Sequence, residues 1–273
     1  MDRFSRCILV SDYDETLVDY GYELSRADLE AIGYFTAHGG IFTIATGRSL
    51  PTARRRLASV PTNAPVLVCN GAVCCQKDGS EVLFCDPLPT DFRSVLERYT
   101  NLYPQLVPEV QSLGCHWTCR CTAERSDWLV GEGADLLCSD WEHIPQPAVN
   151  FVLYAENCDP YKLPPDAQIA LLLARLGAEV GTLSGYEAVH SAPGMLEVSA
   201  EGINKGRAAR RLAKLLGRDT LICAGDAPND LPMLQEADFA FVPAGSRLKR
   251  GFSETAPCGG VIADIVGKLE TLL

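Results

Sequence analysis

The feature that most constrains this chain is a series of short apolar runs, each followed directly by a polar or glycine-containing turn. The runs lie at 7–10, 41–45, 66–69, 221–224 and 239–242. Strands that are apolar on both faces are typical of a parallel sheet covered by helices on both sides. Helices are predicted between the runs, at 25–38, where Ser25 and Asp28 form a capping pattern, and at 204–216. This alternation predicts an α/β fold built on a doubly wound, mostly parallel, Rossmann-like sheet.

The middle of the chain follows a different pattern. A hairpin turn is predicted at 77–80, and beyond it prolines mix with short apolar runs. A strand is predicted at 149–154 and a helix at 166–176, closed by Gly177. We interpret this stretch as an inserted α+β cap domain at 84–186, between the two parts of a core domain at 1–83 and 187–273.

Charge and composition exclude several classes of protein. The 273 residues carry a net charge of −11, and residues 84–186 alone hold 14 acidic and 6 basic side chains. Nucleic-acid binding needs a basic surface, so no nucleic-acid partner is expected. No apolar run approaches the ~20 residues that span a bilayer, and the N-terminus does not have the pattern of a signal peptide. We therefore predict a cytoplasmic protein without membrane contact, a monomer or a weak homodimer.

The 12 cysteines raise the question of disulfides or a metal site. Several lie inside apolar runs, where free cysteine behaves as a small buried hydrophobe in a reducing compartment. Cys115, His116, Cys119 and Cys121 lie within seven residues and offer zinc-type donors. Structural zinc sites usually pair two such groups across a longer gap, and no second pair completes this one. A loop or strand that is rich in cysteine by chance is the favoured interpretation, with zinc binding as the alternative.

Polar residues stand directly after the predicted strands: Asp12 and Asp14, Thr46, Asn70 and Asp226. In open parallel sheets, ligands bind outside the carboxyl ends of the strands, so these side chains are expected to converge. Asp230 adds a fourth carboxylate to those of Asp12, Asp14 and Asp226. Four carboxylates this close would repel one another without a cation. Mg²⁺ binds carboxylate oxygens together with phosphate oxygens, so magnesium is the expected cofactor.

Donors for a phosphoryl group are present as well. Thr46 offers a hydroxyl, Gly47 a backbone N–H and Lys205 an ammonium group. An aspartate can act as a nucleophile through an aspartyl-phosphate, and a second can act as acid and then base. The combination predicts phosphoryl transfer.

Four motifs in order resemble those of the haloacid dehalogenase superfamily of phosphatases. They are Asp12-Tyr13-Asp14-Glu15-Thr16-Leu17, Thr46-Gly47-Arg48, Asn204-Lys205-Gly206 and Gly225-Asp226-Ala227-Pro228-Asn229-Asp230. The long insertion before Lys205, together with Asn70-Gly71-Ala72, is similar to the Cof-type branch with a type IIB cap. The resemblance extends from about Ile8 to Leu272 and implies a Mg²⁺-dependent phosphatase that acts on sugar phosphates through an aspartyl-phosphate.

The resemblance also implies roles for individual residues. Asp12 would be the nucleophile and a metal ligand, and Asp14 the acid and base, with its backbone carbonyl on the metal. Thr46 and Lys205 would hold the transferring phosphoryl group. The remaining metal positions are Asp226 and Asp230, and the candidates for substrate binding are Gly47, Arg48, Asn70 and Asn229.

One position departs from the family pattern. Many relatives carry glycine where this chain has Glu15, which adds a negative charge beside the first motif.

Two other activities are compatible with these residues. A phosphosugar mutase of the same superfamily would return the phosphoryl group to substrate instead of water. A non-hydrolytic phospho-acceptor module also uses clustered aspartates with threonine and lysine, but such a module is usually a single small domain.

Overall fold

The computed structural model describes residues 2–19, 23–155, 167–192, 194–246, 248, 251–256 and 259–272. The chain divides into two compact units. The first comprises Met1–Gly47, Arg56–Phe84 and Asn204–Leu273, and the second comprises Arg48–Arg55 and Cys85–Ile203. No helix among the described residues is both long and apolar enough to cross a membrane.

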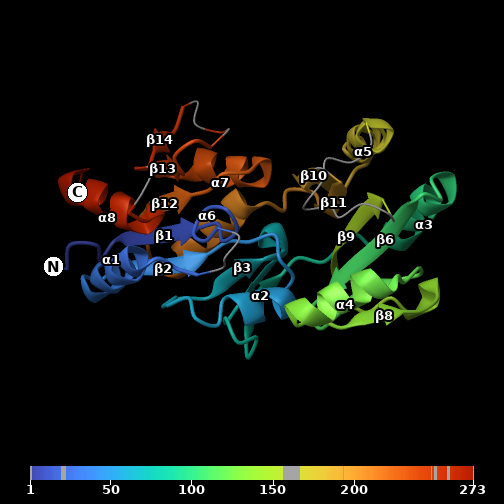
Figure 1. The fold of residues 1–273 in the computed structure, drawn as a ribbon, viewed down its shortest axis with the longest axis horizontal. Coiled ribbons are helices and arrows are strands. Elements are labelled where there is room, and N and C mark those ends of the chain that lie inside the picture. The colour runs from blue at the N-terminus through green and yellow to red at the C-terminus, as the bar shows by residue number, and fades with distance from the viewer. Residues whose placement is uncertain are drawn as a thin grey trace. The chain divides into compact units, whose positions relative to one another are not determined.

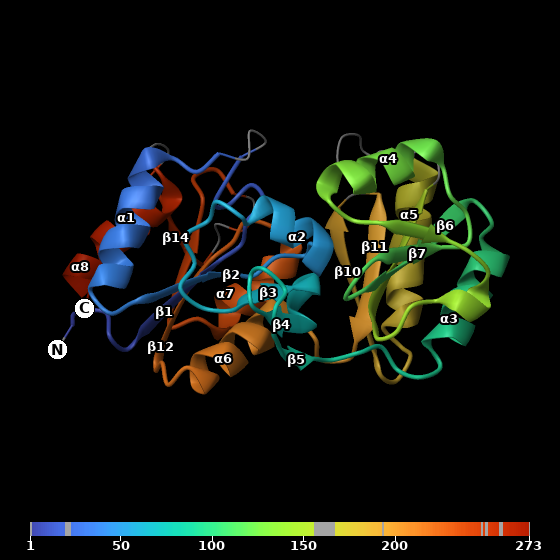
Figure 2. The same cartoon turned by 90° about the horizontal axis from the view of Figure 1, so that it is seen from below.

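The first unit is built on a parallel sheet with the strand order β14-β13-β12-β1-β2. Its strands are β1 (Cys7–Ser11), β2 (Ile41–Ile44), β12 (Thr220–Ala224), β13 (Phe239–Val242) and β14 (Ser253–Glu254). Its helices are α1 (Arg26–Ala37), α6 (Lys205–Leu215), α7 (Leu231–Glu236) and α8 (Val261–Leu272). The α1 and α8 helices lie on one side of the sheet and α6 and α7 on the other (Figure 2). The predicted doubly wound α/β fold is confirmed.

Local sequence explains how these elements begin and where the core lies. Ser25 accepts a hydrogen bond from the Asp28 N–H at the start of α1, as the capping pattern predicts. Alternate residues of β1, Ile8 and Val10, pack with α6 residues such as Leu212 in one buried cluster. Strands with both faces buried therefore form the centre of this unit, as their continuous apolar sequence requires.

A small second sheet completes the first unit, in the order β3-β4-β5. Its strands are β3 (Val66–Val68), β4 (Val73–Cys75) and β5 (Val82–Cys85). The predicted hairpin is present, since Gln76 N donates to Glu81 O at 2.8 Å and Gly79 adopts a φ of 79° in the turn.

The second unit has a six-stranded sheet in the order β10-β11-β9-β6-β7-β8. The strands are β6 (Leu106–Ser112), β7 (His116–Thr118), β8 (Leu136–Cys138), β9 (Ala148–Ala155), β10 (Tyr186–Ala192) and β11 (Met195–Ala200). The helices are α2 (Leu50–Arg56), α3 (Phe92–Leu102), α4 (Ala123–Glu132) and α5 (Ala167–Val180). Residues of α3 and α5 share a buried apolar cluster with the sheet, including Leu96, Phe151 and Leu173. Figure 1 shows α3 to α5 and β6 to β11 in the green-to-gold part of the chain, and α2 in blue.

The structure differs from the sequence interpretation at three places in this unit. The second boundary lies at Ile203 instead of 186, because β10 and β11 pair antiparallel with each other and β11 pairs with β9. Residues 48–55, expected in the core domain, belong to this unit. The α5 helix runs past Gly177 to Val180, while Asp166 lies outside the described residues.

The error at Gly177 has a packing cause. A Cβ at this position would lie 3.1 Å from both His190 Nε2 and Leu196 Cδ1. The glycine therefore permits α5 to approach β10 and β11 closely, and it does not end the helix.

Candidate active site

The two central strands of the first unit bring the first and fourth motifs together. Strands β1 and β12 pair in parallel register, and the Asp12 N–H continues the pairing by donating to Ala224 O at 2.8 Å. Asp226 follows two residues after β12. Both aspartates therefore stand at the carboxyl ends of neighbouring strands, where parallel α/β sheets bind their ligands.

Asp230 closes the loop that carries Asp226. Its Oδ2 accepts hydrogen bonds from the backbone N–H groups of Asp226 and Ala227, both at 3.0 Å. A Cβ on Gly225 would lie 2.5 Å from the Asp230 Cβ, so only glycine fits at the start of this turn. Gly225 and Asp230 of the fourth motif are thus explained by the fully buried Asp230 carboxylate and the loop that wraps it.

Lys205 joins this carboxylate to Asp12. Its Nζ donates to Asp12 Oδ1 and to Asp230 Oδ1, each at 2.6 Å, and the side chain is 1% exposed. Lys205 is the first residue of α6, whose N-cap Asn204 accepts from the Arg207 N–H. A Cβ on Gly206 would lie 2.3 Å from Pro232 O, so glycine is needed where α6 meets α7. Each residue of the third motif therefore has a structural reason.

Negative charge exceeds positive charge in this buried group. The two carboxylates raise the pKa of the Lys205 ammonium despite its burial, so the lysine remains charged. Burial and the neighbouring Asp230 raise the pKa of Asp12 well above its ordinary value, with Lys205 acting against them. Burial likewise raises the pKa of Asp226 to about 6, although a hydrogen bond from Thr16 opposes the shift. One ammonium thus does not balance the carboxylates around it.

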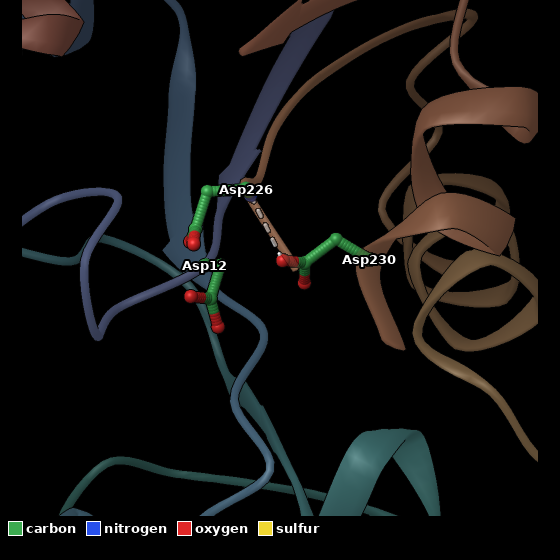
Figure 3. A group of neighbouring side chains, drawn as sticks. All are labelled: Asp12, Asp226 and Asp230. Atoms are coloured by element: carbon green, nitrogen blue, oxygen red, sulfur yellow. Dashed lines mark hydrogen bonds between the residues drawn. The ribbon is translucent and has the colours of Figure 1, made fainter. Parts of the chain in front are cut away.

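A divalent cation would correct this imbalance, and the donor set fits one. Asp12, Asp226 and Asp230 each offer a carboxylate oxygen, and these oxygens lie within 4.8 Å of one another (Figure 3). No other group of three or more acidic, histidine or cysteine side chains in the described part of the chain meets this condition. Asn229 Oδ1 is also buried and has no hydrogen-bond partner among the described residues. All-oxygen donors at this site are the kind that Mg²⁺ prefers.

The other predicted residues of the first unit lie in connected positions. Thr46 is buried after β2, and its backbone O accepts from the Asn70 N–H at 3.0 Å. Asn229 Nδ2 donates to Asn70 Oδ1 at 3.0 Å, and a Cβ on Gly47 would lie 3.2 Å from the same oxygen. Asn70 adopts a φ of 53°, a left-handed conformation that asparagine tolerates better than most residues. Thr46, Gly47, Asn70 and Asn229 are thus brought together by direct contacts.

Asp14 and Arg48 are not part of these groups. Strand β1 ends at Ser11, so Asp12 and Asp14 follow the strand instead of sharing one of its faces. Asp14 is partly exposed and its carboxylate lies outside the close group of three. Arg48 belongs to the second unit, where its Nη1 lies 2.8 Å from Glu132 Oε2. This ion pair gives Arg48 a structural role that its place in the motif did not indicate.

Two polar contacts to Asp226 were missed by the sequence analysis. Thr16 Oγ1 donates to Asp226 Oδ1 at 2.6 Å, and Ser246 Oγ donates to Asp226 O at 3.2 Å. Thr16 stood within the first motif, which was a usable signal. Ser246 lies 20 residues beyond Asp226 and gave none.

The structure also places Glu15 and His116, two residues whose roles the sequence left undecided. Glu15 is exposed, has a φ of 61°, and contributes to the raised pKa of Asp226. The left-handed backbone explains why glycine suits this position. His116 is engaged at both ring nitrogens, by Glu109 and Ser49, so it is not available to join the neighbouring thiols in binding zinc.

Comparisons with known proteins concern the fold and the family of this chain. The family model of the haloacid dehalogenase-like hydrolases matches residues 9–103 and 163–243. SMU.1108c from Streptococcus mutans UA159 superposes with a TM-score of 0.78 at 15% identity, covering 97% of this chain and 98% of that chain. The phosphatase BT1666 from Bacteroides thetaiotaomicron gives 0.74 at 21% identity, with coverage of 98% and 95%.

The match extends to the cap. The solved structure of the subclass IIB sugar phosphatase BT4131 gives a TM-score of 0.75 at 18% identity, covering 97% of this chain and 98% of that chain. At such identities the similarity shows a shared fold, including the mostly antiparallel sheet of the second unit. The family model, which covers most of the sequence, shows more: this chain belongs to the haloacid dehalogenase-like hydrolases.

Proposed function

We propose that this protein is a Mg²⁺-dependent phosphatase of small phosphorylated metabolites, with sugar phosphates as the foremost class. The observation that carries the proposal is the buried group of Asp12, Asp226 and Asp230 with Lys205 bonded to two of them. Its excess negative charge suits a divalent cation, and its ammonium suits a phosphoryl oxygen. The sugar phosphatase BT4131, with the same fold, supports the choice of substrate class.

In the proposed reaction, an Asp12 carboxylate oxygen attacks phosphorus while the alcohol leaving group takes a proton from Asp14. Asp14 then removes a proton from water, which hydrolyses the aspartyl-phosphate and releases inorganic phosphate. Lys205 binds a phosphoryl oxygen and orients Asp12, and the Thr46 hydroxyl and Gly47 N–H donate to the remaining oxygens. Asn70 and Asn229, which bond to each other, are proposed to contact the substrate.

The metal would be held by Asp12, Asp226 and the Asp14 backbone carbonyl, with Asp230 in support. When bound, Mg²⁺ would supply positive charge that neutralises the phosphate dianion and the carboxylates. The residues of this chain then account for binding, orientation and proton transfer.

Hydrolysis of p-nitrophenyl phosphate by the purified protein tests the proposal. We expect activity with Mg²⁺ that stops in excess EDTA and is restored by added Mg²⁺. Full activity in EDTA would contradict the metal assignment. A panel of phosphorylated metabolites then ranks the substrates. Release of inorganic phosphate separates a phosphatase from a mutase, and turnover separates it from a phospho-acceptor that holds a long-lived phospho-aspartate.

A further inference from the structure

A buried chain of polar contacts in the second unit ties residues 48–55 to its sheet. Ser49 Oγ lies 2.7 Å from His116 Nε2, and His116 Nδ1 lies 2.6 Å from Glu109 Oε1. Arg125 donates to both Glu109 oxygens at 2.8 Å. Ser49, His116 and Glu109 are almost fully buried, and none takes part in the chemistry proposed above.

The charges in this chain of contacts give its hydrogen bonds a direction. Burial alone would raise the pKa of Glu109, but Arg125 and His116 hold it at about 2, so the carboxylate is ionised. The Glu109 carboxylate therefore accepts a hydrogen bond from His116 Nδ1–H, and the Arg125 guanidinium balances its negative charge. The other ring nitrogen, Nε2, shares a hydrogen bond with the Ser49 hydroxyl, so both ring nitrogens of His116 have a buried partner.

Two other contacts hold the same segment in the second unit. Arg48 pairs with Glu132 at the end of α4, with both side chains mostly buried. The next residue, Gly133, has a φ of 90°, and a Cβ there would lie 3.2 Å from Arg55 Cδ. Both ends of residues 48–55 are thus fixed against α4 and β7.

This segment is joined at both ends to the first unit. Thr46 and Gly47 precede it directly in the chain. The last residue of α2, Arg56, belongs to the first unit, where its carbonyl accepts a hydrogen bond from Tyr13 Oη at 3.2 Å. Tyr13 stands between Asp12 and Asp14. A short helix anchored in the second unit is therefore linked to both the proposed nucleophile segment and the proposed phosphoryl-binding loop.

We propose that Ser49 and His116 are positioning residues that fix residues 48–55 in the second unit and thereby restrain Thr46 and Gly47, which precede this segment directly in the chain. This inference rests on the proposed function. The order Ser49, His116, Glu109 is that of a hydrolytic triad. However, Ser49 is 1% exposed and its hydroxyl is held by His116 and Thr52, so a substrate does not reach it. The contacts therefore hold a segment in place and do not form a second catalytic centre.

The matched pair of variants is Ser49→Ala and Ser112→Ala. Ser112, the last residue of β6, is also buried, and its hydroxyl donates to Cys115 O at 2.8 Å, away from residues 48–55. We expect Ser49→Ala to lower kcat on p-nitrophenyl phosphate by roughly 10- to 100-fold, the scale of a displaced catalytic group, with a smaller change in KM. We expect Ser112→Ala to keep kcat within about twofold of the wild type. Glu132→Gln, which weakens the ion pair between Arg48 and Glu132, should also lower kcat.

Amide hydrogen exchange provides a readout that does not depend on activity. Exchange over residues 44–57 should increase in Ser49→Ala and stay at the wild-type rate in Ser112→Ala. If the wild type hydrolyses no phosphate ester, the proposed function fails while the exchange result still tests the coupling. An active wild type with the two serine variants alike in kcat and in exchange would overturn the inference. Labelling of Ser49 by a fluorophosphonate would also overturn it, since a reactive serine must be accessible.

Discussion

Replacement of Lys205 by methionine is the most informative single perturbation of the candidate site. The change keeps the length of the side chain and removes the ammonium that bonds to Asp12 and Asp230. Loss of one partner from a buried ion pair typically costs about 3–5 kcal/mol, because the charge left behind is uncompensated. Lys205 therefore contributes to stability as well as to the proposed chemistry, which its place at the start of a helix did not indicate.

Magnesium should oppose this loss. The variant group carries one more negative charge than the wild type, so it should bind a divalent cation at least as strongly. A ligand at about 100 times its Kd stabilises the folded state by about 2.7 kcal/mol, which is a large share of the expected cost. We therefore expect Mg²⁺ to raise the free energy of unfolding more in Lys205→Met than in the wild type. Mg²⁺ should not restore the activity of Lys205→Met, since loss of one transition-state donor lowers kcat by about 10²–10³.

Urea unfolding with Mg²⁺ and with EDTA measures the first effect, and hydrolysis of p-nitrophenyl phosphate measures the second. Lys214→Met is the control, because Lys214 lies on the same helix and is exposed. It should change neither quantity. A Lys205→Met protein as stable as the wild type in EDTA, with the same response to Mg²⁺, would refute the assignment of Lys205 as the counter-charge of this group.

Three further predictions follow from single residues. Asp12→Asn should abolish turnover, while Asp14→Asn should still form a phosphoenzyme with a good leaving group, detectable by intact mass; near-normal kcat in Asp12→Asn would rule out the covalent route. Glu109 has its pKa lowered from 4.5 to about 2 in the folded protein, so its contribution, on the order of 3 kcal/mol, is present above about pH 4.5 and lost as the pH falls toward 2. The difference in unfolding free energy between wild type and Glu109→Gln should narrow over that range, and a constant difference would contradict the burial argument. Glu15→Gly should raise stability by roughly 1 kcal/mol, because glycine adopts the left-handed φ of 61° without strain, and unchanged urea unfolding would count against this.

The parallel sheet and the meeting of Asp12 with Asp226 were predictable because both follow from local pattern. An apolar run of four or five residues between two helices leaves few options besides a central strand, and parallel strands end at the same edge. The limits of α5 and of the second unit were not predictable in this way. Gly177 has the sequence signature of a helix end, yet its partners His190 and Leu196 come from strands later in the chain. Whether a glycine ends a helix or admits a neighbour depends on contacts that local sequence does not contain.

The second motif shows the same limit at finer scale. Thr46, Gly47 and Arg48 are consecutive, so sequence comparison treats them as one unit of function. Gly47 is fitted to Asn70 in the first unit, whereas the guanidinium of Arg48 pairs with Glu132, 84 residues away, in the second. The motif therefore divides between Gly47 and Arg48, because Gly47 packs against Asn70 and Arg48 pairs with Glu132. A substitution at Thr46 should act directly on phosphoryl binding. One at Arg48 should act through the position of α2, and Glu132→Gln should reproduce part of its effect.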